Sequence, residues 1–471
     1  MTSPASGDTA FFGHPKGLGY LAGTEGWERF SFFGMQALLM LYITKHLLTP
    51  EVAPSVIGLA SFRKLVSALF GPMTDFAFAV QIFGLYGGFI LVTPLIGAWL
   101  GDRVYGRTRM VTIGVLLMAA GHFAMASEAT FLLALLLLIL GGGCITGNMK
   151  PQISGLYAPE DSRRTRAFVI YQIAINLGAL ISPLIIGTLG EKIGFHWGFG
   201  AAGIGMLVGL VVYLVGRRHI PPDVGTEREA VPPLTRAQWI SIGTLLLVLT
   251  PVIFATATAV QAYGIMIIWA ETAVDRKVFG FEMPVSWIFT IEAIMTIAWL
   301  FLCNRLWARW KRQGREPNDL TKHGFGNVLV VLSFLIIAVL ATMPKVPLIG
   351  WIGFYVILTF SFAWYGPPVL SLISRFAPPS VNGVMLSMYS FAAALGFFLV
   401  GYMGRFYEPL GPPLFFLVNA MLPVGGALML FLFNRPLMRL LETAEREQLA
   451  NVGGAAPNTD MPPIPANVNQ G

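Results

Sequence analysis

The sequence predicts an all-α polytopic membrane protein with about twelve transmembrane helices in two six-helix bundles. Of its 471 residues, 55% are hydrophobic and only 12% are charged, a composition that cannot cover a water-facing globular surface. Apolar runs of roughly 20 residues, enough to cross about 30 Å of hydrocarbon, recur along the chain. These runs leave no polar face for a barrel lumen, so we expect helices, which satisfy their own backbone hydrogen bonds in lipid.

The apolar runs define the expected transmembrane spans. They lie near residues 18–46, 78–101, 108–126, 130–149, 166–189, 195–216, 237–271, 285–309, 325–343, 348–374, 381–407 and 413–434. The amphipathic stretch 52–71 is expected to form a helix in an external loop. Residues 1–16 contain no apolar stretch that ends in a small-residue cleavage site, so the first span is expected to be retained.

Basic residues indicate the orientation of the chain, because short cytoplasmic loops retain Lys and Arg. The basic segments DRVYGRTR, DSRRTR, GRRH and NRLWARWKRQGR follow the second, fourth, sixth and eighth spans. All four would lie on the same side of the membrane. We therefore expect both termini to be cytoplasmic in an inner-membrane protein. The net charge of +7 then reflects topology, and no nucleic-acid partner is expected.

The polar segments divide the chain into parts. Residues 1–216 are expected to form an N-terminal six-helix bundle and residues 237–434 a C-terminal one. Residues 217–236, rich in Pro and charge, separate them and are expected to form a cytoplasmic linker. Residues 435–471 are expected to form a cytoplasmic tail that is largely disordered, because from residue 445 they lack apolar periodicity.

The segment GAWLGDRVYGRTR, residues 97–109, resembles the loop motif of the major facilitator superfamily. Gly97 and Gly101 would allow close approach of helices, and the charged residues could pair across the cytoplasmic seam between the bundles. The plainer alternative is a basic cytoplasmic loop without further function. The resemblance implies a gating role, without substrate binding, for Asp102, Arg103 and Arg107.

Three charged residues lie inside the first span. Glu25, Glu28 and Arg29 are at positions i, i+3 and i+4 of a helix, so they share one face and can neutralise one another. An acid held by a neighbouring cation stays ionised, and it can take up a proton when that cation moves away. This arrangement suits a proton switch. The alternative is a structural ion-pair cluster that only fixes packing.

These charges belong to an ExxERF element, and the segment around it resembles the start of the proton-dependent oligopeptide transporter family. GNMKPQISGLY resembles the fourth-helix motif of that family and contains Lys150, while YQIAINLGALISP resembles its fifth-helix motif and contains Asn176. The resemblance implies the major facilitator fold and proton-driven import of short peptides. Lys150 would be a counter-ion to the first-helix charges or would snorkel to the interface. Asn176 would line the site or bond two helices.

The C-terminal half departs from this family. The segment VDRKVFGFEMPVSWIF resembles the family's approach to the eighth helix and fixes the register. In that register Val260 stands where the family usually has Glu, and Gln261 matches the family's Gln. Phe362 stands where an acid usually receives the amino terminus of the peptide. Both acids are therefore missing, and the pocket is expected to be less polar.

Glu292 is the deep carboxylate that remains in the C-terminal half, at a position where the family usually has Asn. No Lys or Arg lies within a helical turn of it, so an external partner such as a substrate ammonium is expected. It could instead take over the proton function of the lost seventh-helix acid. The alternative is a protonated Glu that is hydrogen-bonded within the bundle. The family's aromatic residue of the eleventh helix is present as Tyr389, whereas Phe32 and Phe33 replace its paired first-helix tyrosines.

Other functional classes receive little support from the sequence. A channel would need a continuous polar path or filter, and none is visible. The chain contains no P-loop, so an ion gradient must supply the work. The six His residues are scattered singly and do not show metal-binding spacing, while Cys144 and Cys303 both lie in apolar segments. We therefore expect no enzyme activity, disulfide, metal site or cofactor.

The sequence thus predicts a proton-coupled symporter that imports di-/tripeptides or peptide-like solutes by alternating access. The alternative is a related carrier for a non-peptide anionic or amphipathic solute, such as nitrate, a cell-wall peptide or a natural product, or an exporter. The expected partners are a small solute, protons and the lipid bilayer, and no oligomer is required. The residues expected to couple protons are Glu25, Glu28, Arg29, Lys150 and Glu292. Those expected to bind substrate are Arg29, Lys150, Asn176, Gln261, Glu292 and Tyr389.

Overall fold

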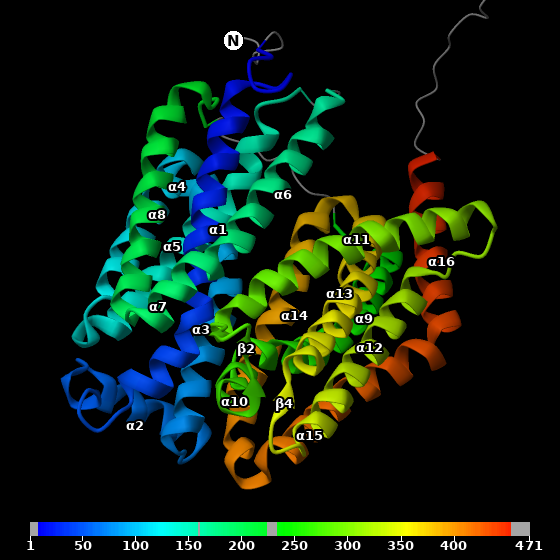
Figure 1. Cartoon of the computed structure of the whole chain (residues 1–471). Coiled ribbons are helices and arrows are strands. Elements are labelled where there is room, and N and C mark those ends of the chain that lie inside the picture. Colours follow the sequence, from blue (N-terminus) through cyan, green and yellow to red (C-terminus); the bar gives the residue numbers. More distant parts are fainter. Residues whose placement is uncertain (1–7, 159–160, 224–232, 454–471) are drawn as a thin grey trace, which may run out of the picture.

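The structure, a computed structural model, describes residues 8–158, 161–223 and 233–453 and is built almost entirely of helices (Figure 1). The long helices of the N-terminal half are α1 (Lys16–Tyr42), α3 (Asp75–Leu100), α4 (Arg107–Ala124), α5 (Phe131–Ser154), α6 (Arg163–Ser182) and α8 (Phe195–Gly216). Those of the C-terminal half are α9 (Arg236–Ala259), α11 (Ile288–Arg312), α12 (Asp319–Leu340), α13 (Leu348–Phe376), α14 (Asn382–Met403) and α15 (Tyr407–Leu432).

These helices are long and apolar enough to form a multi-span membrane protein. Within the described ranges, 9 segments could cross a membrane by length and composition, and one of them, Pro379–Leu432, contains both α14 and α15. Helices α1 and α4 lie outside these segments but pack in the same bundle, so twelve long helices correspond to the predicted spans. The predicted all-α polytopic fold is confirmed.

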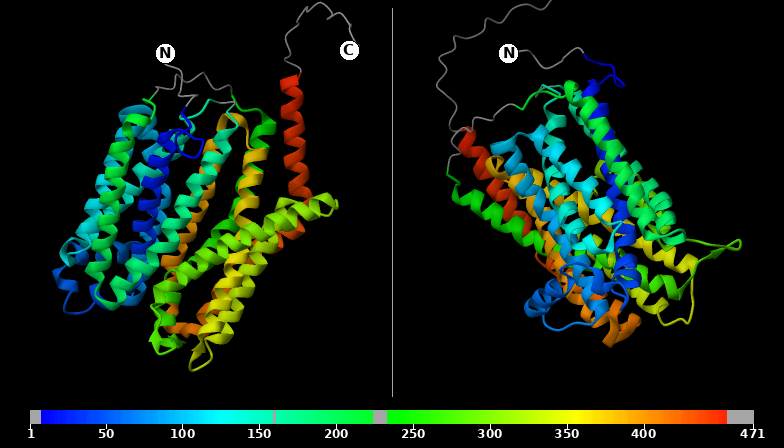
Figure 2. Two further views of the ribbon diagram at one scale, coloured as in Figure 1. Left: turned by 45° about the horizontal axis from the view of Figure 1, so that its top comes forward. Right: turned by 90° about the vertical axis from the view of Figure 1, so that its left-hand side faces the viewer.

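The two halves lie side by side as separate bundles (Figures 1 and 2). In the N-terminal half, α1 packs against α6 and α8, and α5 packs between α3 and α4. In the C-terminal half, α12 packs against α13 and α15, and α9 packs against α14. The halves contact each other chiefly where α3 packs against α14 and where α6 packs against α11.

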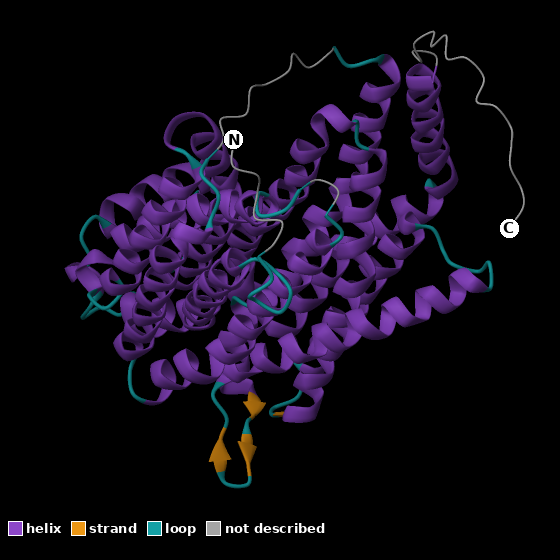
Figure 3. Cartoon of the chain, turned by 90° about the horizontal axis from the view of Figure 1, so that it is seen from above, coloured by secondary structure: helices purple, strands orange, loops and turns teal. Residues whose placement is uncertain are grey.

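The ends of the molecule differ. The start of α1 and helix α16 (Asn434–Gly453) lie at one end in Figure 1, whereas α2 (Leu59–Phe70) and α10 (Ile265–Ala273) lie at the opposite end, which we call the distal end. Helix α2 confirms the helix predicted in residues 52–71. Two small sheets that the sequence did not predict, the parallel pair β1 (Val274–Asp275) and β4 (Val346–Pro347) and the antiparallel pair β2 (Lys277–Val278) and β3 (Phe281–Glu282), are also distal and are visible in Figure 3.

The predicted disordered tail is wrong for residues 445–453, which continue helix α16. Leu437, Leu441 and Ala444 in the first half of α16 recur at helical spacing and are buried, and α16 packs along α9, so the helix has an apolar face that stabilises it. Residues 454–471 lie outside the described part of the chain. Residues 224–232 of the predicted linker also lie outside it.

Glycines allow α3 and α5 to pack closely, as the loop motif predicted. A Cβ atom on Gly97 would lie 2.1 Å from the carbonyl oxygen of Gly143, and one on Gly101 would lie 1.9 Å from Oδ1 of Asn148. The amide nitrogen of Asn148 donates to the carbonyl of Gly97 at 2.9 Å. Here a side chain as small as Ala would force the two backbones apart.

Replacing Gly97 with Ala should therefore destabilise the fold. Overpacking of this kind costs roughly 1–3 kcal/mol. Thermal unfolding of purified protein in detergent should show a lower Tm for G97A than for wild type. Gly243 is a matched control in α9, because a Cβ atom there meets nothing within 4 Å, and the Tm of G243A should be no lower than that of wild type, since Ala favours the helix. Equal Tm values for G97A and G243A would contradict the close packing.

Candidate functional site

A cavity of about 300 Å³ lies between the two halves. Helices α1 and α6 contribute Phe33, Gln36 and Asn176 from the N-terminal side. The opposite wall comes from α9, α11, α13 and the 3₁₀ turn η7 (Val260–Ala262) with the residue after it, Tyr263. A cavity at the interface of two helical repeats is the usual place for a transported solute.

Glu292 is the charged side chain of this cavity. Among the described residues that line it, no other side chain carries a formal charge. The hydroxyl of Tyr263 donates a hydrogen bond to its carboxylate, and the Tyr263 ring stacks on Phe289 with centroids 5.2 Å apart. Within the described ranges, Glu292 has no ion pair with Lys or Arg. The carboxylate is therefore available to a cation in the cavity.

The walls around Glu292 are largely apolar. Val260 and Phe362, the positions at which we expected the family's acids to be missing, both line the cavity, as does Phe33. The register inferred from the sequence therefore places both substitutions on the cavity surface. Its polar groups other than Glu292 are uncharged and include Gln36 and Asn176. Such a surface suits an amphipathic solute that has apolar side chains.

The three charges of α1 come together as the sequence predicted. Arg29 Nε lies 3.0 Å from Glu25 Oε1 and 2.9 Å from Glu28 Oε2. Both Glu residues are 1% exposed, so one guanidinium serves two buried carboxylates. Arg29 also donates to Thr146 Oγ1 of α5 at 3.3 Å. The cluster therefore ties α1 to α5 and places two carboxyl groups against one guanidinium.

Lys150, Gln261 and Tyr389 do not line the described cavity. Lys150 is exposed on α5, one helical turn beyond Thr146. Gln261 is fully buried, and its amide donates to Asn419 Oδ1 at 3.3 Å inside the C-terminal bundle. Tyr389 packs against a neighbouring hydrophobic cluster of that bundle. Arg29 is likewise outside the lining, so the substrate roles of these four residues stay predictions.

Hydrogen bonds join the two halves near the distal end and at mid-height. Glu191 lies in the short helix α7 (Thr188–Lys192), which follows α6 in the chain. Its carboxylate accepts hydrogen bonds from the backbone nitrogens of Val285 at 2.8 Å and Ser286 at 2.9 Å. Lys45 pairs with Glu271 across the same seam. In the part of the chain that is described, no hydrogen bond or ion pair joins the halves at the end that carries α16. The described conformation is thus closed at the distal end.

The loop motif forms contacts within the N-terminal half. Arg107 Nε lies 2.8 Å from Asp102 Oδ1, and the Arg103 guanidinium lies 6.0 Å from the centre of the Trp99 ring. Pairing across the seam between the halves, which we expected of these charges, is absent from the described contacts. The reason is that Asp102 already has a partner five residues away. A gating role for the motif stays a prediction.

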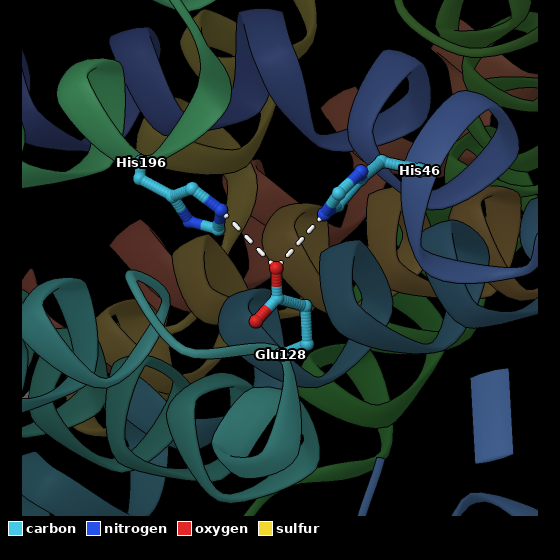
Figure 4. A group of neighbouring side chains, drawn as sticks. All are labelled: His46, Glu128 and His196. Carbon is cyan, nitrogen blue, oxygen red and sulfur yellow. Dashed lines mark hydrogen bonds and ion pairs between the residues drawn. The ribbon is translucent and has the colours of Figure 1, made fainter. Parts of the chain in front are cut away.

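The prediction that the histidines are scattered singly is wrong for two of them. His46 and His196, 150 residues apart in sequence, both contact the carboxylate of Glu128 (Figure 4). The N-terminal half brings the end of α1 and the starts of α5 and α8 together at the distal end. Spacing along the chain could not reveal this group, because each residue lies in a different loop or helix end.

The family model for the Major Facilitator Superfamily matches residues 30–401. The chain belongs to this superfamily. Similar proteins include an uncharacterized transporter, YclF, of Bacillus subtilis (strain 168), which is 28% identical and aligns with 89% of this chain and 94% of its own. A di-/tripeptide transporter of Lactococcus lactis subsp. cremoris is 25% identical over 92% and 98% of the two chains.

The fold of the chain is also similar to solved structures of peptide transporters. A crystal structure of peptide transporter POT in complex with sulfate matches this member of the superfamily with a TM-score of 0.77 and 25% identity, over 92% of this chain and 96% of that one. The resemblance to the proton-dependent oligopeptide transporter family, inferred from the motifs of α1, α5 and α6, is confirmed.

Tyr263, the partner of Glu292, was not predicted. A signal for it was present: the apolar segment Arg236–Ala273 has 38 residues, far more than the roughly 20 that cross a bilayer. A break near its middle is therefore expected, and broken helices of transporters often line binding sites. Turn η7 is that break, and Tyr263 follows it directly.

Removing the Glu191 carboxylate should open the distal end. Loss of its two charge-assisted hydrogen bonds weakens closure by at least about 1.5 kcal/mol, which is about a tenfold change in the ratio of closed to open protein. Spin labels on cysteines at the exposed positions Ile57 and Phe279, with Cys144 and Cys303 replaced by Ser, report the separation of the halves. Pulsed electron paramagnetic resonance should show longer distances for E191A.

The control for this experiment is E51A, since Glu51 is an exposed residue at the same end. Its distance distribution should match that of the unmutated labelled protein. A short, unchanged distribution in E191A would mean that the Glu191 contacts do not hold the halves together.

Proposed function

We propose that the chain is a proton-coupled symporter that imports di-/tripeptides or peptide-like solutes by alternating access. The observation that carries this proposal is the cavity between the halves, with Glu292 available to a cation and largely apolar walls around it. Similarity to proteins described as di-/tripeptide transporters supports the substrate class. A peptide offers the groups that such a cavity would recognise, namely an ammonium and apolar side chains.

Glu292 receives the positive group of the solute in this proposal. The acid that would otherwise bind a peptide's amino terminus is replaced by Phe362, and Glu292 lies in the same cavity. Tyr263 holds the carboxylate by its hydrogen bond, so the side chain is oriented before the solute arrives. Asn176 supplies a neutral hydrogen-bonding group from the opposite half.

The Glu25, Glu28 and Arg29 cluster couples transport to protons. Protonation of either carboxylate removes one of the two ion pairs of Arg29, and the guanidinium can then move further toward α5, whose Thr146 it already contacts. Because α1 also lines the cavity through Phe33 and Gln36, a change at the cluster moves the cavity wall. Lys150, one turn from Thr146, would serve as the further counter-ion.

The proposed setting is the plasma membrane, with both termini in the cytoplasm and residues 217–236 as the cytoplasmic linker between the halves. The basic loops after the even-numbered spans support this orientation. In this orientation the distal end is outside, and the described conformation faces inward. The inward proton gradient then drives the solute in the same direction.

A second candidate is a carrier for an amphipathic solute that is not a peptide. Val260 and Phe362 on the cavity wall favour it, because each replaces an acid of the peptide carriers. A small anion such as nitrate is less favoured, since the described lining includes no Lys or Arg.

Replacing Glu28 with Gln should uncouple uptake from the proton gradient. The neutral amide cannot release and take up a proton, yet it keeps the shape of the side chain. In proteoliposomes, gradient-driven uptake should fall at least about tenfold, the difference expected from about 1.4 kcal/mol, while exchange of labelled for unlabelled solute across the membrane persists. E51Q, on the exposed distal surface, should behave like wild type. Full gradient-driven uptake by E28Q would refute the assignment.

Replacing Glu292 with Gln should weaken binding of a solute that carries an ammonium. Hydrogen bonds to charged groups contribute about 1.5–3 kcal/mol, so the KM for uptake should rise about tenfold or more. Y263F provides a graded comparison, because it keeps the carboxylate and removes only its hydrogen-bond donor. If uptake by E292Q and its pH dependence were both unchanged, Glu292 would have no part in transport.

A further inference from the structure

Three potential metal ligands meet at the distal surface of the N-terminal half. His46 lies in the π-helical turn η1 (Ile43–Leu47), Glu128 in the 3₁₀ turn η4 (Glu128–Thr130), and His196 in the first turn of α8. They form the one group of three His, Cys, Asp or Glu side chains in the described ranges whose positions could hold a metal ion. None of the three lines the cavity between the halves.

The geometry of the group is close to that of a metal centre. Both Nε2 atoms point at the same carboxylate oxygen, Glu128 Oε1, at 2.9 Å for His46 and 3.2 Å for His196 (Figure 4), and one ligand atom of each residue lies within 4.8 Å of the others. Ligands bound at about 2.1 Å in a tetrahedron are separated by roughly 3.4 Å. Small side-chain movements therefore suffice for all three to bind one ion.

The surroundings hold the ligands in place but leave them accessible. The His46 ring lies 5.5 Å from the Tyr42 ring and 6.2 Å from the Phe195 ring, between centroids. The side chains of His46, Glu128 and His196 remain 33%, 30% and 42% exposed. An ion can thus enter from solvent, and little ordering is required when it binds.

A group of two imidazoles and one carboxylate has the composition of three-ligand zinc sites, in which water occupies the fourth position. The simpler interpretation is that Glu128 only accepts hydrogen bonds from two histidines. That arrangement places two donors on one oxygen, and a metal ion would instead bind both nitrogens directly. We propose that His46, Glu128 and His196 bind a divalent transition-metal ion of the zinc type.

Binding here would also act on the contact between the halves. Lys45, the residue before His46 in η1, pairs with Glu271 of the C-terminal half. A metal ion anchored by Glu128 and His196 would fix η1 in the position from which Lys45 reaches Glu271. The bound ion would therefore favour the conformation that is closed at the distal end, and it requires no transported solute to do so.

The test is a metal-binding titration of the purified full chain in detergent, with any affinity tag removed. Zn²⁺ is titrated in competition with a chromophoric chelator, and Co²⁺ is added to metal-free protein to record its visible absorption. We expect one Zn²⁺ per chain and a Co²⁺ spectrum of the intensity typical of four-coordinate sites. H46Q and H196Q should each bind Zn²⁺ at least tenfold more weakly, whereas H219Q, which changes a partly buried histidine in the turn after α8, should bind like wild type.

Failure of wild type to bind stoichiometric Zn²⁺, or equal affinity in H46Q, H196Q and H219Q, would overturn the proposal. E128Q guards against misfolding of the histidine variants, because it keeps both rings and removes the carboxylate charge, and it too should bind at least tenfold more weakly. These readouts do not depend on transport, so their failure and failure of the proposed symport can be distinguished.

Discussion

The structure depends on one electrostatic constraint, which is that charged side chains inside an apolar helix must neutralise one another. Arg29 pairs with both Glu25 and Glu28 within 3.0 Å, in a region where an isolated ion would cost several kcal/mol. The charged face of α1 therefore lies toward α5, where the Arg29 guanidinium also donates a hydrogen bond to Thr146. The adjoining positions Phe33 and Gln36 then face the other half and form the cavity wall. The pairing of the three α1 charges thus sets the position of the α1 surface that lines the cavity.

The C-terminal half contributes one carboxylate to the cavity, that of Glu292. Glu292 has no cation beside it in the described ranges and is held by Tyr263, so its charge can be balanced from within the cavity. The two halves are fastened at the distal end, where Glu191 binds the start of the segment that leads into α11. Alternating access needs a binding site between the halves and contacts that close one end. Here Glu292 marks the site, and the distal contacts can break while each bundle stays intact.

Much of this was predictable from sequence. The twelve spans follow from apolar length, and the pairing in α1 follows from helical spacing, since both depend only on residues near one another in the chain. Val260, Phe362 and Glu292 were placed in the site by the family's register. The contacts of Gln261 with Asn419 and of His46 and His196 with Glu128 were not predictable, because they join segments far apart in sequence. Helix α16 was missed although Leu437, Leu441 and Ala444 recur at helical spacing, so the sequence did carry a signal for it.

The measurement that tests the central claim most directly is uptake of a labelled dipeptide into proteoliposomes, with and without a gradient that is acid outside and negative inside. Peptide symport predicts that the dipeptide accumulates only when the gradient is present, and that a proton ionophore abolishes accumulation. No uptake by folded, correctly reconstituted protein would contradict peptide transport. It would mean that Val260 and Phe362 have moved the specificity of the cavity to another amphipathic solute.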